Sequence, residues 1–128
     1  MKLLGIAVAL TCFAGFANAA QLSANETSPA VAAKVALRGD AFGVKVSEMR
    51  ITRKNDILVV QADLYNTKSE NRTVFYRFRW LDSAGNQVGD GESWKQIGLY
   101  GLQQQMVKGV APSAAASDLK LEMNVENK

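Results

Sequence analysis

The sequence contains no histidine, and in 128 residues it has only one cysteine and two prolines. The absence of histidine removes the most common general base and the most common metal ligand of proteins. Nucleophile systems that rely on a histidine base are therefore excluded, and so are zinc sites with imidazole ligands. Only carboxylate or lysine chemistry remains. We therefore expect a protein that is not an enzyme and that has no cofactor and no metal site.

The chain also has little net charge. Its 15 Lys and Arg residues stand against 12 Asp and Glu residues, which gives a formal net charge of +3. Domains that bind nucleic acid usually carry a clustered basic excess, and this sequence has none. We therefore expect no nucleic-acid partner.

Residues 1–19 have the three-part layout of a secretory signal peptide. A short positive start at Met1 and Lys2 precedes an uncharged, mostly apolar run over residues 3–16. The small-residue pattern Ala17-Asn18-Ala19 then provides a cleavage site. The apolar run is shorter than the roughly 20 residues that cross a membrane. We expect cleavage near Ala19 and a soluble periplasmic protein that keeps no transmembrane helix.

The single cysteine, Cys12, leaves an alternative open, because lipoproteins are cleaved directly before a cysteine that is then acylated. Acylation favours a large aliphatic residue three places before the cysteine and a small one directly before it. Here Ala9 and Thr11 occupy those places. We therefore favour the soluble protein over an outer-membrane lipoprotein anchored through Cys12. If the site at Ala19 is used, the mature chain has neither a disulfide nor a thiol.

The rest of the chain is predicted to be a flexible leader over residues 20–30 and one domain over residues 31–128. In the domain, apolar and polar residues alternate with the period of a strand, and turn-forming residues separate the runs. The first run is rich in alanine and could be helical instead. The pattern favours an all-β fold, an immunoglobulin-like β-sandwich of about seven strands. The expected strands cover residues 31–37, 44–51, 57–65, 74–81, 94–97, 104–110 and 119–125.

The most aromatic of these strands separates two kinds of side chain. Tyr76, Phe78 and Trp80 share one face and are expected in the core, because three large rings are the main apolar content of so small a domain. Arg77 and Arg79 then lie side by side on the outer face. Their guanidinium groups could bind a phosphate or a carboxylate of a lipid, a glycan or a partner. The alternative is that they are solvated charges paired across the sheet.

Two further aromatic residues are candidates for contact with a partner. Trp94 follows a glycine-rich bend, where an exposed tryptophan could be a binding hot spot; the alternative is that it plugs the end of the sandwich. Tyr100 belongs to the segment Leu-Tyr-Gly-Leu, which could be a contact loop. The alternative there is a turn whose apolar residues are tucked in.

Two runs in the chain resemble a known family. Residues 62–66 read ADLYN, and residues 76–85 read YRFRWLDSAG, with a Tyr-Arg-Phe-x-Trp strand before an Asp-x-x-Gly turn. From residue 57 onward the sequence resembles the YcfL family of small bacterial envelope proteins without established activity. The resemblance implies an immunoglobulin-like sandwich at the cell envelope and adds no catalytic residues. Family members are often lipoproteins, a feature from which this chain departs.

These observations predict a non-catalytic periplasmic binding or accessory module that contacts another envelope protein. The contact would use a sheet edge or the outer face with Arg77 and Arg79. One alternative is a module that binds anionic lipid or glycan through the same two arginines. A further alternative is an enzyme that acts on glycan through carboxylates such as Asp90 and Glu92.

Overall fold

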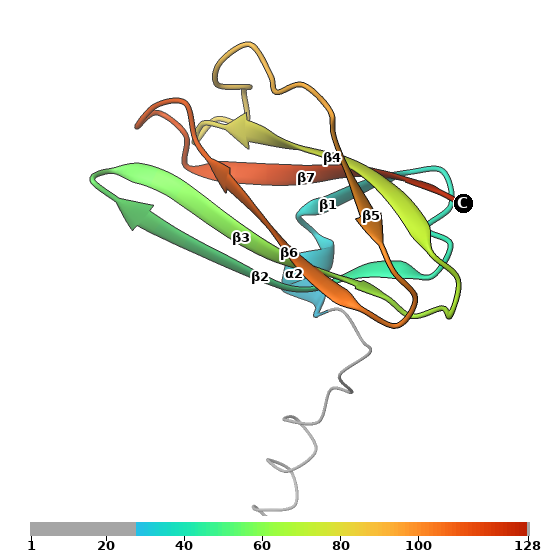
Figure 1. Cartoon of the computed structure of the whole chain (residues 1–128). Coiled ribbons are helices and arrows are strands. Elements are labelled where there is room, and N and C mark those ends of the chain that lie inside the picture. Colours follow the sequence, from blue (N-terminus) through green and yellow to red (C-terminus); the bar gives the residue numbers. More distant parts are fainter. Residues whose placement is uncertain (1–27, 128) are drawn as a thin grey trace, which may run out of the picture.

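The computed structural model describes residues 28–127, which form seven strands and one short helix (Figure 1). A four-stranded sheet with the order β1-β7-β4-β5 packs on a three-stranded sheet with the order β2-β3-β6. Neighbouring strands are antiparallel, except that β1 runs parallel to β7. The predicted all-β, immunoglobulin-like sandwich is confirmed. In chain order the elements are α2 (Pro29–Ala32), β1 (Val35–Arg38), β2 (Val44–Lys54), β3 (Ile57–Asn66), β4 (Arg72–Leu81), β5 (Lys95–Leu99), β6 (Gln104–Val110) and β7 (Asp118–Glu126).

The core lies between β3 and β4, the strands with the clearest alternation. The inward side chains of β4 are Tyr76, Phe78 and Trp80, all buried as the sequence predicts. The rings of Tyr76 and Phe78 meet edge to face with centroids 6.2 Å apart, and those of Phe78 and Trp80 are 5.9 Å apart. Such contacts add about 0.5–1.5 kcal/mol to the gain from burial alone. The facing side chains of β3 are aliphatic and equally buried: Leu58, Val60, Ala62 and Leu64.

The two sheets approach closely where β6 crosses the aromatic core. Gly109 of β6 lies directly over Phe78, and a Cβ atom at Gly109 would come within 2.5 Å of the phenyl ring. Because a protein interior has no room for such an overlap, glycine is required there. This close approach fixes β6 over β4.

The first predicted strand divides into two elements. The Ser28 side chain accepts a hydrogen bond from the Val31 amide at 3.3 Å, and Pro29 occupies the first turn, so the start of α2 is capped in the usual way. Pairing with β7 then begins where the Leu121 amide donates to the Lys34 carbonyl at 2.7 Å. The alanine-rich run is therefore helical at its start and extended at its end.

The predicted signal peptide over residues 1–19 and most of the leader over 20–30 lie outside the described residues, as does Cys12. Within residues 28–127, no helix has the length and the apolar character needed to cross a membrane.

Candidate binding face

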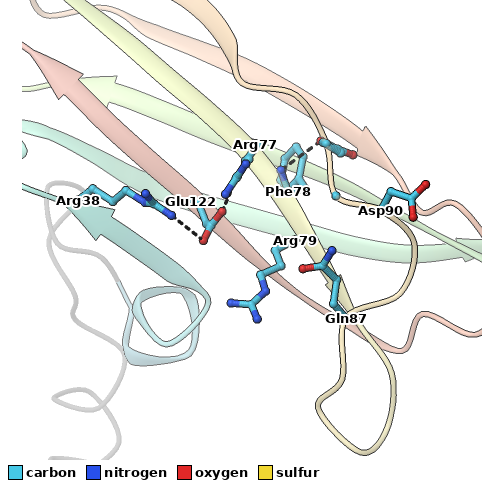
Figure 2. Close-up of a pocket in the computed structure, with 9 residues that line it drawn as sticks. Arg38, Arg77, Phe78, Arg79, Gln87, Asp90 and Glu122 are labelled. Carbon is cyan, nitrogen blue, oxygen red and sulfur yellow. Dashed lines mark hydrogen bonds and ion pairs between the residues drawn. The ribbon is translucent and has the colours of Figure 1, made fainter.

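The outer face of the four-stranded sheet carries the two arginines that the sequence singles out. Because Phe78 of β4 points into the core, its neighbours Arg77 and Arg79 point outward, as the alternation predicts. Two strands of the same sheet add basic side chains, Arg38 from β1 and Lys120 from β7. We call these four residues, together with Glu122 and Trp94, the arginine face; Figure 2 shows its three arginines and Glu122.

Arg77 is paired across the sheet. It stands directly opposite Glu122 of β7, and its Nε donates to Glu122 Oε1 at 2.6 Å. Arg38 Nη2 lies 3.6 Å from the other carboxylate oxygen. For Arg77 the cross-strand pair, one of the two sequence-based alternatives, is therefore what the structure shows. The positive charge of Arg77 is therefore paired with a carboxylate of the same chain.

Glu122 is the acidic centre of the face and is only 7% exposed. The hydrogen bond from Arg77 is the main cause that lowers the pKa of Glu122 below its ordinary value of 4.5. The nearby positive charges of Arg77, Arg38 and Arg79 lower the pKa further, whereas burial opposes them. Glu122 is therefore ionised at neutral pH, and three guanidinium groups act on one carboxylate.

Trp94 completes the paired part of the face. The guanidinium carbon of Arg77 lies 4.4 Å from the centroid of the indole ring, and that of Arg38 lies 5.3 Å away. Cation–π contacts of this kind are worth about 0.5–1 kcal/mol each at exposed sites. Trp94 is 37% exposed and lies on the sheet surface just before β5, so it does not plug the end of the sandwich.

Arg79 differs from Arg77 because the residue opposite it is another cation, Lys120 of β7. Lys120 Nζ donates to the carbonyl of Ala33 at 3.0 Å. Within the described part of the chain, Arg79 makes no hydrogen bond or ion pair, although its charge still acts on Glu122 (Figure 2). Like charges directly opposite each other destabilise a sheet. Arg79 and Lys120 thus form a cationic pair on the exposed surface of the sheet, and neither makes an ion pair with a carboxylate among the described residues.

A cleft of about 240 Å³ lies beside this pair, between the arginine face and the loop after β4. The loop contributes Gln87, Asp90, Gly91 and Glu92 to the lining, and the sheet contributes the three arginines, Phe78 and Glu122. The lining holds three acidic and three basic side chains, so the cleft itself carries no charge excess. Lys120, which is not part of the lining, adds a further positive charge on the sheet surface opposite Arg79.

Glu92 supports the fold rather than facing a ligand. Its Oε1 accepts from the Phe78 amide and from Lys95 Nζ, each at 3.1 Å, and its Oε2 accepts from Trp80 Nε1 at 3.0 Å. Burial raises the pKa of Glu92, but the bonds from Trp80, Phe78 and Lys95 together lower it below its ordinary value. All three donors that hold the Glu92 carboxylate belong to the fold itself, namely the Phe78 amide, the Trp80 indole and Lys95.

Tyr100 is the one predicted contact residue that lies apart. It follows β5 in the turn to β6, next to Leu99, which pairs with Arg72 at the opposite end of β4 from Arg79. Its side chain is 63% exposed, whereas Leu99 is buried. The turn therefore tucks in one apolar residue and presents the next one to solvent.

Sequence reasoning missed three members of the face: Arg38, Lys120 and Glu122. Alternation places Lys120 and Glu122 on the outer side of the last strand, so their orientation follows from the pattern. Their positions opposite Arg79 and Arg77 depend on the order and register of the strands, which no local pattern contains. Arg38 directly follows the run over residues 31–37, whose structure the sequence left open.

The fold and the face together define a small β-sandwich domain with a cationic, tryptophan-bearing outer sheet surface. The chain belongs to the family described as a protein of unknown function, DUF1425, whose model matches residues 20–125.

Two solved structures are similar to this chain. A DUF1425 family member from Shewanella sp. pv-4 is 29% identical, with a TM-score of 0.56 over 66% of this chain and 78% of that one. The crystal structure of Campylobacter jejuni cj0090 is 20% identical, with a TM-score of 0.61 over 73% of this chain and 98% of that one, and shows the fold alone. No curated protein matches the chain.

Proposed function

We propose that the protein is a non-catalytic binding module of the bacterial cell envelope and that it contacts an acidic surface of another envelope protein. The contact lies on the arginine face. The observation that carries the proposal is the pair formed by Arg79 and Lys120, two cations in directly opposite register positions, neither of which makes an ion pair among the described residues.

An acidic partner would relieve the cost of this arrangement. A carboxylate placed between Arg79 and Lys120 would replace a cross-strand repulsion with two attractions, and the guanidinium group can bind a carboxylate through two parallel hydrogen bonds. The neighbouring Trp94, in contact with two guanidinium groups, offers an aromatic surface of the kind that is enriched at interfaces. Because Arg79 and Lys120 lie on strands of one sheet, their backbone positions are already set before binding.

The envelope location is inferred from the sequence. Residues 1–19 have the layout of a signal peptide with cleavage near Ala19, and the chain resembles the YcfL family of envelope proteins. Membership of DUF1425 is compatible with that finer family name. The non-catalytic role is supported by the absence of histidine and by the structural use of Glu92.

Site-specific photo-crosslinking in living cells tests the proposal. A photoreactive amino acid at Gln87, an exposed residue that lines the cleft beside Arg79 and leaves both cations in place, is expected to give a reproducible adduct with another envelope protein. The same amino acid at Lys54, an exposed lysine at the end of β2 in the other sheet, serves as the control and is expected to give none. Reproducible failure at Gln87, or equal adducts at both positions, would contradict the proposal.

Anionic lipid or glycan is the second ligand class, since phosphate and carboxylate groups suit the same guanidinium forks. If this class is bound instead, replacing Arg77 and Arg79 with Ala will reduce sedimentation of the protein with phosphatidylglycerol vesicles or with purified sacculi. Unchanged sedimentation excludes it.

A further inference from the structure

A second surface is found in the segment that joins the two sheets on one side of the sandwich. Seven large hydrophobic side chains are exposed among the described residues, and four of them lie within residues 100–110. This concentration is unusual because single exposed apolar residues are normally scattered. The four residues are Tyr100, Leu102, Met106 and Val110.

This segment contains β6, the least protected edge strand among the described residues. Natural edge strands are guarded by shortness, bulges or charges. β1 has 4 residues, and β2 has a bulge between Val46 and Glu48 and five charged side chains. β5 has 5 residues. β6, in contrast, has 7 residues, one charged side chain (Lys108) and an unbroken register with β3.

The backbone N–H and C=O groups of β6 point in two opposite directions, which alternate from one residue to the next. The Ala111 amide donates to the Leu58 carbonyl at 2.9 Å, and the Asn66 amide donates to the Gln103 carbonyl at 3.0 Å. In the antiparallel register, odd-numbered residues of this segment therefore bond to β3. The N–H and C=O groups of Gln104, Met106 and Lys108 consequently point away from the sheet, toward its free edge.

The outward side chains of this segment form a pattern that matches the same strand of a second copy when the two run antiparallel. Along one side of β6 the order is Gln104, Met106, Lys108 and Val110, and the exposed Leu102 lies in the turn just before the strand. If a second copy pairs antiparallel about Met106, Gln104 meets Lys108, Met106 meets itself, and Val110 comes to the end of the partner strand where the turn with Leu102 lies. Centring the pair on Lys108 instead would oppose two positive charges, which destabilises a sheet.

The turn before β6 holds its apolar residues in place. Leu102 adopts a left-handed φ of 58°, a conformation that favours glycine. Its amide donates to the Lys68 carbonyl at 2.8 Å, and the amide of Gly101 donates to Asn71 Oδ1 at 3.1 Å. A Cβ atom at Gly101 would lie 2.1 Å from the Ser69 carbonyl oxygen. A strained conformation that is maintained by its surroundings motivates a functional hypothesis, and here it presents Leu102 to solvent.

We infer that the chain forms a symmetric dimer through β6, in which two three-stranded sheets join edge to edge with Met106 on the two-fold axis. The interface is isologous, so each copy supplies the same strand. Because β6 belongs to the three-stranded sheet, the arginine face stays free in both copies. The dimer would thus present two binding faces.

Sedimentation velocity of the purified chain over a concentration series tests the dimer. We expect a concentration-dependent rise from monomer to dimer mass. Met106→Lys places two positive charges against each other on the axis and should reduce the association constant about tenfold or more. Ile51→Lys, the same change at an exposed aliphatic residue of the opposite edge strand, should leave association unchanged. A chain that stays monomeric at all concentrations, or a Met106→Lys variant that still dimerises normally, would overturn the inference.

Cysteine scanning tests the register in a Cys12→Ser background, where the introduced thiol is alone. In the proposed register the two Met106 Cα atoms lie about 5.5 Å apart, within the range of about 4.4–6.8 Å that a disulfide spans. Met106→Cys should therefore form a disulfide-linked dimer under mild oxidation. Lys108→Cys should not, because its two copies would be four residues out of register, about 13 Å apart. Equal or preferred crosslinking of Lys108→Cys would refute the register.

The proposed dimer and the proposed binding function can be tested independently of each other. Arg79→Glu should leave the dimer intact, and Met106→Lys should leave the face of each monomer intact.

Discussion

At the scale of single residues, the Glu92 carboxylate accepts a backbone hydrogen bond beyond the end of a paired strand. β5 begins at Lys95, opposite Tyr76, so the Phe78 amide lies beyond the end of that pairing. Glu92 accepts the hydrogen bond that a longer strand would have accepted, and it also binds the buried indole N–H of Trp80. The loop after β4 is thereby tied to the core, and it forms one wall of the cleft beside the arginine face.

The first prediction concerns this carboxylate and pH. Because folding lowers the pKa of Glu92, the ionised group stabilises the fold above the ordinary value of 4.5, and the contribution is lost as pH falls through the folded-state pKa. Glu92→Gln should lower the free energy of unfolding at neutral pH by about 1 kcal/mol, a modest figure because the group is partly exposed. The variant should also lose less stability than the parent as the pH falls below 4.5, the ordinary pKa of a glutamate. Urea unfolding across that pH range measures both effects, and an unchanged pH profile would refute this role.

The second prediction concerns Gly109, which lies against the Phe78 ring. Gly109→Ala should lower the free energy of unfolding by about 1–3 kcal/mol, since the added methyl group would overlap the ring. Gly98→Ala on β5 is the matched control, because no atom lies within 4 Å of its added Cβ. Thermal unfolding of both variants tests this contact, and equal melting temperatures would contradict it.

At the scale of elements, the β2–β3 hairpin depends on two residues in left-handed conformations. Asn55 and Asp56 have φ angles of 50° and 67°, typical of a two-residue type I′ turn. Asp56→Gly produces the favoured Asn-Gly sequence and should raise the free energy of unfolding by about 0.5 kcal/mol. Asp56→Val should lower it by about 1–2 kcal/mol, because a β-branched residue resists positive φ. Denaturant titration of both variants tests the turn; a stabilising Asp56→Val would contradict it.

Most strands could be predicted from alternation because that pattern is local. The inward residues of β3 and β4 and the outward position of Arg77 and Arg79 follow from it directly. The pairing of strands does not, since Arg77 and Glu122 meet across 45 positions of sequence. Whether an outward arginine is neutralised, as Arg77 is, or left beside a cation, as Arg79 is, depends on that register. The sequence left the first run open between strand and helix because short alanine-rich runs suit both conformations, and the cap at Ser28 favours the helix α2 at its start.

At the scale of the whole molecule, the two sheets have different outer surfaces, and we propose that one binds a partner while the other forms the dimer. The four-stranded sheet carries the arginine face, and the three-stranded sheet ends at the unprotected edge of β6. A dimer through that edge would leave both arginine faces exposed. Two linked faces can raise the apparent affinity for a repeated or clustered partner without any new contact.

Binding of an acidic partner at the arginine face is tested most directly by the effect of one charge reversal on the adduct formed in living cells at Gln87, which lines the cleft beside Arg79. With the photoreactive amino acid at Gln87, Arg79→Glu is predicted to reduce the crosslinked fraction about tenfold or more, because a like charge opposed to an acidic surface is strongly unfavourable. Lys54→Glu, an equal reversal on the other sheet, is predicted to leave the adduct unchanged. An adduct that survives Arg79→Glu at full yield, or that falls equally in both variants, would contradict a partner bound at the arginine face.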